Sequence, residues 1–240
     1  HHGLGPVKGG RLLVLVLALR APAPAGGERR SVAVLFADLA GFTKLTSEAD
    51  AEEVHRLLGR YFEVVDGIVA RSGGTVDKHI GDATMAVFGA PVAHGNDVER
   101  AVRAACDIHD AMAALSAEFG RTLATHVGVA SGEVVAASTG SAVRADYTVT
   151  GDAVNLASRL EELAGAGETI VSDDVRAALG SRLDAESRGT VAVRGFARPG
   201  TKTDHWGRAE SLASPPIVAI TPEHYNRMVR LCARGVPVRI

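Results

Sequence analysis

The chain has 240 residues, 46% of them hydrophobic, and its 26 basic and 28 acidic residues leave a formal net charge of −2. This length and apolar content suffice for one sizeable domain core. The balanced charge and an aromatic content of 4% argue against a nucleic-acid partner, which calls for basic surfaces and stacking platforms. Cys106 and Cys232 lie far apart without a CxxC pattern, so neither a disulfide framework nor a zinc site is predicted.

Residues 1–28 are expected to form an N-terminal extension and linker. Residues 12–19, LLVLVLAL, are an uninterrupted apolar run, and residues 21–28, APAPAGGE, have linker composition. The run is too short to span a bilayer as a helix, so membrane association is not expected. It reads as the apolar part of a secretory signal, as an additional packed strand, or as a remnant of a longer polypeptide. We favour the remnant, because the chain begins at His1 rather than Met, and we expect a cytoplasmic protein.

From about Arg29 the apolar pattern predicts alternating strands and helices. SVAVLFAD predicts a buried strand, and apolar residues at helical spacing predict a helix from Asp50 to the following glycine pair. TVDKHI and ATMAVF, joined by a Gly-Asp turn, predict a β-hairpin. A second amphipathic helix is expected at 96–119, followed by the strand ATHVGVA.

This order of strand, helix, hairpin, helix and strand predicts an α+β fold with a ferredoxin-like βαββαβ core, in which an antiparallel sheet carries helices on one face. Extra strands are expected at EVVAA, YTVT and TVAVR, and an extra helix from Asp152 to about Ala164. We assign residues 29–208 to this domain. Residues 209–240, which a proline pair interrupts, are expected to form a C-terminal appendage of unknown role.

Two aspartates, Asp38 and Asp82, each stand where an apolar strand-like run meets a glycine-containing turn. An unpaired carboxylate is costly to bury, so two of them on neighbouring strands suggest a shared cation. The cation expected is Mg²⁺ or Mn²⁺ carrying phosphates. Taken alone, each aspartate is more readily explained as a turn residue or a helix cap. Their joint context favours the metal.

Four separated motifs carry a resemblance to the class III nucleotide cyclases. They are FADLAGFT (36–43), KHIGDATMAVFG (78–89), GVASGEVVA (128–136) and RADYTVTGDAVNLASRLE (144–161). Together they resemble the family in order and spacing over roughly residues 29–206. The resemblance implies a nucleotide cyclase fold and a homodimer whose catalytic sites lie between two copies of the domain. It also implies an adenylate cyclase, which converts ATP to 3′,5′-cyclic AMP and pyrophosphate.

The resemblance assigns roles in catalysis residue by residue. Asp38 and Asp82 would hold two ions of Mg²⁺ or Mn²⁺ per site, and the backbone carbonyl of Leu39 would complete the coordination. Asn155 would orient the ribose. Arg159 would stabilise the charge that develops on the α-phosphate, for which a guanidinium fork is well suited.

By the same resemblance, Lys78 and Thr148 read the purine and Arg194 binds phosphate. The ammonium of Lys78 can only donate, so it suits N1 of adenine and opposes the N1 hydrogen of guanine. Thr148 can accept from the amino group of adenine, but a hydroxyl also donates and therefore discriminates less firmly than an aspartate. The pair resembles a branch that includes bicarbonate-responsive adenylate cyclases, which suggests bicarbonate as an effector.

Simpler interpretations of the same residues stay open. Lys78 and Thr148 are ordinary strand residues when taken singly, and Asn155 and Arg159 fit the polar face of a helix on which Arg159 pairs with Glu162. At the level of function, the alternative is a catalytically weak nucleotide-binding or dimerisation module of a larger signalling protein. A diguanylate cyclase is disfavoured, because the sequence contains no GGDEF or GGEEF turn.

Overall fold

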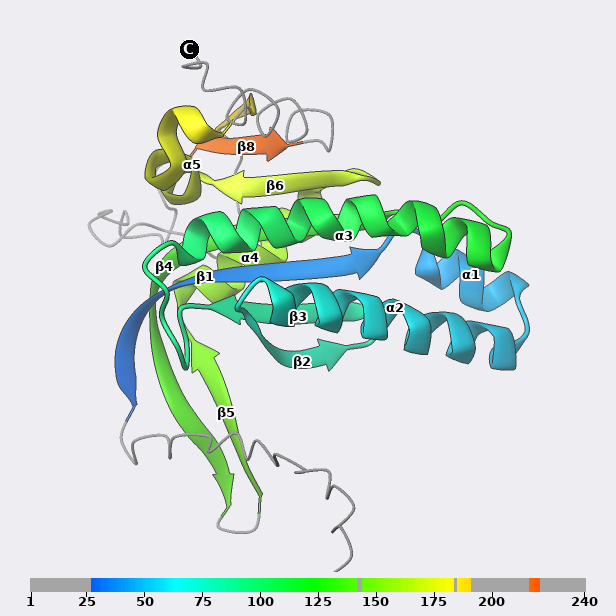
Figure 1. Cartoon of the computed structure of the whole chain (residues 1–240), viewed down its shortest axis with the longest axis horizontal. Helices are drawn as coiled ribbons and strands as arrows, with labels where there is room; N and C mark the ends of the chain where they lie inside the picture. The colour runs from blue at the N-terminus through cyan, green and yellow to red at the C-terminus, as the bar shows by residue number, and fades with distance from the viewer. Residues whose placement is uncertain (1–26, 142–143, 184, 191–215, 221–240) are drawn as a thin grey trace, which may run out of the picture.

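The computed structural model describes residues 27–141, 144–183, 185–190 and 216–220 (Figure 1). Within these described residues, eight strands form one sheet in the order β2-β3-β1-β4-β6-β8-β7, and β5 pairs with β4 off this path. The strands are β1 (Glu28–Leu39), β2 (Thr75–Ile80), β3 (Ala83–Phe88), β4 (Thr125–Ser141), β5 (Arg144–Thr150), β6 (Glu168–Ser172), β7 (Glu186–Thr190) and β8 (Pro216–Ile220). The helices are α1 (Phe42–Glu48), α2 (Ala51–Arg71), α3 (Asp97–Phe119), α4 (Asp152–Leu163), α5 (Asp173–Leu179) and the short 3₁₀ helix η1 (Gly180–Arg182).

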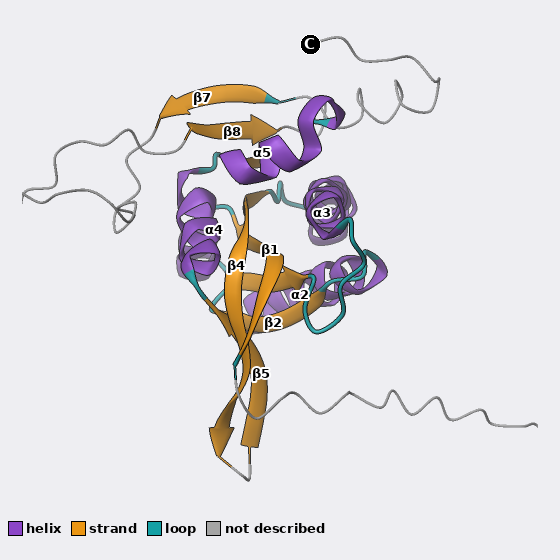
Figure 2. Ribbon diagram, turned by 90° about the vertical axis from the view of Figure 1, so that its left-hand side faces the viewer, coloured by secondary structure: helices purple, strands orange, loops and turns teal. Residues whose placement is uncertain are grey.

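The α+β class and the order of the core elements are confirmed, with two differences in detail. β4 pairs in parallel with β6, so the sheet is mixed rather than antiparallel. Helices also cover both faces: α2 and α3 lie on one side of the sheet and α4 on the other (Figure 2). The second face is covered because the strands of the sheet centre are apolar on both sides and need a helix against each.

Two predicted strands, ATHVGVA and EVVAA, are parts of one continuous strand. β4 runs for 17 residues, and the residues between the two parts stay extended because Ser131 and Gly132 pair with Ala33 and Val32 of β1. The outer half of β4 and β5 form a hairpin that projects from the body of the domain (Figures 1 and 2). Thr190 ends β7, and the rest of the predicted strand TVAVR lies outside the described residues.

The C-terminal segment contributes one described strand. β8 lies between β6 and β7 in the sheet and is antiparallel to both. Among the described residues, no helix has the length and the hydrophobicity that a membrane crossing requires.

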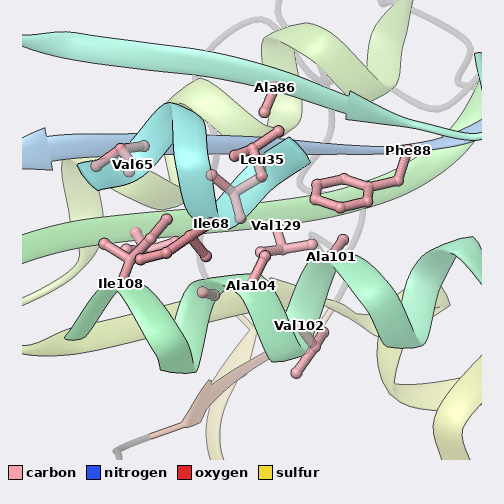
Figure 3. Packing of buried hydrophobic residues seen from close by; sticks show 14 of the residues in the cluster. Leu35, Val65, Ile68, Ala86, Phe88, Ala101, Val102, Ala104, Ile108 and Val129 are labelled. Carbon is pink, nitrogen blue, oxygen red and sulfur yellow. The ribbon is translucent and has the colours of Figure 1, made fainter. Parts of the chain in front are cut away.

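Alternation along β1 divides the core into two layers. Leu35 and its neighbours of the same parity pack with α2 and α3, in a cluster that includes Val65, Ile68 and Ile108 (Figure 3). Val34 and Phe36 belong to the other cluster, which includes Leu156 and Leu160 of α4. Successive side chains of a strand point to opposite faces, so Asp38 follows Val34 and Phe36 onto the face that α4 covers.

Helix α4 lies close against β4 at Gly128. A Cβ atom at this position would overlap the carbonyl oxygen of Ala157 and the backbone nitrogen of Glu161. The glycine is therefore required by the close approach of two backbones. It sets the distance between the helix that carries Asn155 and Arg159 and the strand beside β1.

Replacing Gly128 by alanine should lower the stability of the domain by about 2 kcal/mol or more, because α4 must move away from the sheet. Gly59, in the middle of α2, is the matched control: a Cβ atom there meets nothing within 4 Å. Gly59→Ala should stabilise the protein by roughly 0.5–1 kcal/mol. Urea unfolding of the two variants measures both effects, and a Gly128→Ala protein as stable as the original chain contradicts the packing described.

Candidate functional site

The two predicted metal-binding aspartates come together at one end of the sheet centre. Asp38 lies near the end of β1, opposite His126 of β4. Asp82 lies in the turn between β2 and β3, and β3 is the other neighbour of β1. Burial, followed by hydrogen bonding to Asp38 and the negative charge of Asp38, raises the pKa of Asp82 to about 7. The two carboxyl groups are therefore close enough to disfavour the state in which both are ionised.

This pair fits a cation that is shared with a substrate. Mg²⁺ is usually held by one or two carboxylates together with substrate phosphates and water, rather than by a full cage of side chains. Among the described residues, no group of three or more His, Cys, Asp or Glu side chains is arranged to hold a metal ion. Asp38 and Asp82 would supply the two carboxylates of such a site, and their assignment to Mg²⁺ or Mn²⁺ stays a prediction.

Leu39 has a structural part in this arrangement. Its backbone N–H donates to Oδ1 of Asp38 at 3.0 Å, which helps to orient that carboxylate. Its side chain is buried in the core with α2 and α3. Coordination of an ion by the Leu39 carbonyl stays a prediction.

A third carboxyl group near the pair, Glu161, was not found by sequence reasoning. It lies on α4, and burial, Asp38, Glu162 and Asp82, in that order, raise its pKa to about 7. The contribution of Asp38 and Asp82 shows that α4 brings Glu161 into their field. An excess of negative charge thus gathers where β1, the β2–β3 turn and α4 meet, and a bound cation would relieve it.

The two predicted purine-reading residues are in direct contact. Nζ of Lys78 on β2 donates to Oγ1 of Thr148 on β5 at 3.2 Å. Asp77, which sequence reasoning missed, completes a cluster of three: its Oδ2 atom accepts from Thr148 Oγ1 at 3.0 Å and lies 3.0 Å from Lys78 Nζ. The Asp77 side chain is only 4% exposed, against 47% for Lys78, so a buried carboxylate supports an accessible ammonium.

A β-bulge explains how Asp77 and Lys78 reach the same partner. Regular alternation would send adjacent side chains to opposite faces of β2. The register shifts here, since Val76 pairs with Ala86 and Lys78 pairs with Met85, which leaves Asp77 as the inserted residue. Such a bulge re-aims side chains next to it. No pattern in the sequence predicts this bulge.

The next residue of β2, His79, belongs to a separate contact. Its Nε2 atom lies 3.0 Å from Asp66 Oδ1, and its ring stacks on Phe62 with the centroids 3.9 Å apart. Both partners come from α2. His79 therefore anchors β2 to the helix and is not part of the cluster around Thr148.

Asn155 and Arg159 form a third group on the exposed side of α4. Nη1 of Arg159 lies 2.6 Å and 2.7 Å from the two carboxylate oxygens of Glu162. The ion pair expected from the simpler interpretation is thus present within a single chain. Arg194, the predicted phosphate-binding residue, lies outside the described residues.

The predicted residues accordingly fall into three groups, which are the acidic pair, the purine-reading contact and the polar side of α4. Exposure of the third group leaves it available to a ligand or to a second copy of the chain. Arg159 is held by Glu162 in the single chain, and an exposed pair of this kind contributes little stability. A phosphate could therefore displace Glu162 at small cost.

Comparison with protein families and curated proteins gives consistent matches. The model of the adenylate and guanylate cyclase catalytic domain matches residues 27–209. An uncharacterised protein of Mycobacterium tuberculosis (strain ATCC 25618 / H37Rv) is 38% identical over 178 residues, which are 72% of this chain and 32% of that protein. A second protein of this strain, also uncharacterised, is 39% identical over 178 residues, 72% of this chain and 31% of its own length. The chain spans about a third of these relatives.

Solved structures with the same fold include enzymes of both base specificities. The adenylyl cyclase CyaB from P. aeruginosa matches with a TM-score of 0.72 and 29% identity, over 81% of this chain and 95% of that chain. The guanylyl cyclase Cya2 matches with a TM-score of 0.70 and 30% identity, over 81% and 92%. The catalytic core of a rhodopsin-guanylyl cyclase with converted specificity, in complex with ATPαS, matches with a TM-score of 0.70 and 26% identity, over 81% and 97%.

The raised pKa of Asp82 predicts how two quantities change with pH: the stability of the metal-free protein and the rise in Tm that Mn²⁺ causes. The folded protein keeps a proton on Asp82 that the unfolded chain has lost, so this group makes the metal-free protein less stable as pH rises from about 4 to about 7. Binding of Mn²⁺ requires the ionised carboxylate. The rise in Tm caused by Mn²⁺ should therefore be larger at pH 8 than at pH 6.

Differential scanning fluorimetry with and without Mn²⁺ measures both trends. Asp82→Asn is the matched variant, because it keeps the shape of the side chain and removes its titration. It should lose the response to Mn²⁺ at both pH values. A response to Mn²⁺ that is the same at pH 6 and pH 8 in the original chain, or that survives in Asp82→Asn, contradicts the assignment of Asp82 to the cation.

Proposed function

The chain belongs to the family of adenylate and guanylate cyclase catalytic domains, and from that premise we propose that it is an adenylate cyclase, which converts ATP to 3′,5′-cyclic AMP and pyrophosphate. The observation that carries the choice of ATP is the contact between Lys78 and Thr148 at 3.2 Å. Lys78 offers only donors, which suit the N1 acceptor of adenine. Relatives of known structure act on either purine, so the choice rests on these residues.

The acidic pair supports the phosphate end of this reaction. Asp38 and Asp82 would hold Mg²⁺ or Mn²⁺, two ions per site, which would acidify the ribose 3′ hydroxyl and neutralise the triphosphate. The N–H of Leu39 holds one oxygen of Asp38 at 3.0 Å, so the carboxylate is oriented before any ligand arrives. This preorganisation lowers the cost of assembling the site.

The polar side of α4 supplies the remaining groups in this proposal. Asn155 would hydrogen bond the ribose and keep the 3′ hydroxyl in line with the α-phosphorus. Arg159 would leave Glu162 and donate from its guanidinium to the α-phosphate, where charge develops. An arginine used in this way contributes roughly 10³- to 10⁵-fold to phosphoryl transfer.

We assign these groups to two copies of the chain. One copy supplies Asp38 and Asp82, and the other supplies Lys78, Thr148, Asn155 and Arg159. The exposure of Asn155 and Arg159 on α4 suits residues that act on a nucleotide held partly by a partner. Closed twofold dimers are the most frequent assemblies of identical chains, and such a dimer contains two equivalent sites.

The proposal includes three finer points about the cellular setting. ATP as the substrate implies a cytoplasmic location. Bicarbonate is retained as an effector on the strength of Thr148. Because the chain spans about a third of its curated relatives, the signal that controls the domain is expected from other parts of a longer protein.

Product formation from ATP and from GTP is the direct test. With Mn²⁺ present, the purified chain should form cyclic AMP, and its kcat/KM for ATP should exceed that for GTP by about tenfold or more, as expected for a site built on hydrogen bonds to the base. Liquid chromatography of the products measures both activities. A chain that binds ATP and forms no cyclic product would instead be the nucleotide-binding module.

Mixing two inactive variants tests the shared site. Asp38→Ala and Asn155→Ala should each be inactive as homodimers, because every site lacks one group. In an equal mixture, half of the dimers are mixed and contain one intact site, so about one quarter of the original activity should return. Absence of recovery, with mixed dimers demonstrated by native mass spectrometry, would rule out a site built from two copies.

A further inference from the structure

We propose that Asp77 is a specificity-determining positioning residue, which fixes the direction of the Thr148 hydroxyl so that Thr148 presents an acceptor to position 6 of the purine. This inference rests on the proposed function, in which Lys78 and Thr148 face the base. It addresses the weakness of threonine as a reader, since a free hydroxyl both donates and accepts. Asp77 would remove that ambiguity without touching the nucleotide.

The contacts of Asp77 define what it can do. Its side chain is 4% exposed, and Oδ2 lies 3.0 Å from both Thr148 Oγ1 and Lys78 Nζ. An ionised carboxylate accepts hydrogen bonds and cannot donate. The Thr148 hydroxyl must therefore direct its only hydrogen toward Asp77. A charge-assisted bond to a carboxylate that is itself buried is costly to give up.

The remaining capacity of Thr148 follows by counting. A hydroxyl oxygen has two lone pairs besides its hydrogen. One lone pair accepts from Lys78 Nζ at 3.2 Å, and the second is free to accept from a ligand. The amino group of adenine can donate to it. The carbonyl oxygen of guanine would meet an acceptor with no hydrogen between the two.

Counting the donors of Lys78 in the same way shows what this residue can offer to the base. An ammonium group has three N–H donors, of which one is directed to Asp77 and one to Thr148. The third is available to N1 of adenine, which accepts. The cluster thus offers one donor beside one acceptor, complementary to the N1 and amino edge of adenine.

An amide in place of the carboxylate is the decisive change. The side chain introduced by Asp77→Asn has nearly the same shape as the aspartate but carries N–H donors. The amide can donate to Thr148, and the hydroxyl hydrogen is then free to turn toward a ligand. Thr148 would become an acceptor or a donor as the base requires, and discrimination at position 6 would weaken.

Binding measurements on the full chain test the inference apart from catalysis. The Kd values of ATP and GTP are measured by calorimetry with Ca²⁺, for the original chain and for Asp77→Asn. The original chain should favour ATP by about tenfold or more, and Asp77→Asn should reduce this ratio by about tenfold. Asp66→Asn is the matched control, because Asp66 holds His79 on the same strand and lies outside the cluster, so it should keep the ratio.

A double-mutant cycle separates positioning from a general loss of structure. If Asp77 acts through the hydroxyl, Asp77→Asn should change the ATP to GTP ratio in the original chain and leave it unchanged in a Thr148→Val background. An Asp77→Asn protein that keeps the original ratio overturns the inference, as does an equal effect in both backgrounds.

The unaltered protein gives a second test if Asp77→Asn does not fold. Purine riboside triphosphate keeps N1 and has no group at position 6. An acceptor held ready by Asp77 predicts that it binds about tenfold more weakly than ATP, whereas equal binding overturns the inference. Failure of the proposed reaction would look different: the binding ratios would hold and no cyclic product would form.

Discussion

The arrangement of this domain depends on one strand that is buried from both sides. β1 lies between β3 and β4, and its side chains alternate between the core under α2 and α3 and the core under α4. A shift of one residue would exchange the two faces, and it would move Asp38 from the side that α4 covers to the core under α2 and α3. Asp38 lies on this strand, so the pairing of β1 with β4 fixes its position opposite His126. A carboxylate beside such a core needs hydrogen bonds or a positive charge to offset its loss of hydration.

In the acidic region, the repulsion that destabilises the fold is also what a bound cation would relieve. Asp38, Asp82 and Glu161 are drawn together by the strand end, the hairpin turn and α4, and the pKa values of Asp82 and Glu161 are raised to about 7. The fold holds these groups together against their repulsion. Structures often retain such strain where a ligand relieves it, and a nucleotide that brings cations with it is a ligand of that kind.

The sequence predicted the elements better than their contacts. Asp38 and Asp82 could be placed together because a buried strand and a tight hairpin each leave one position for a carboxylate. β4 was divided in two, because Ser131 and Gly132 look like a turn until their pairing with β1 is known. Asp77 and Glu161 could not be found, because their roles depend on a register shift in β2 and on the close approach of α4 at Gly128.

The bulge in β2 bears on how far the base preference of related chains follows from their lysine and threonine alone. Lys78 and Thr148 are the two residues proposed to contact the base, whereas Asp77 is the residue inserted in β2 where the pairing with β3 shifts. A chain with the same lysine and threonine but without this insertion would return to strict alternation and turn the preceding side chain away. Under the proposed role of Asp77, two such chains would share the lysine and the threonine and differ in their preference between ATP and GTP. In the proposed enzyme, base preference would therefore depend partly on the residue inserted in β2 between positions that pair with β3.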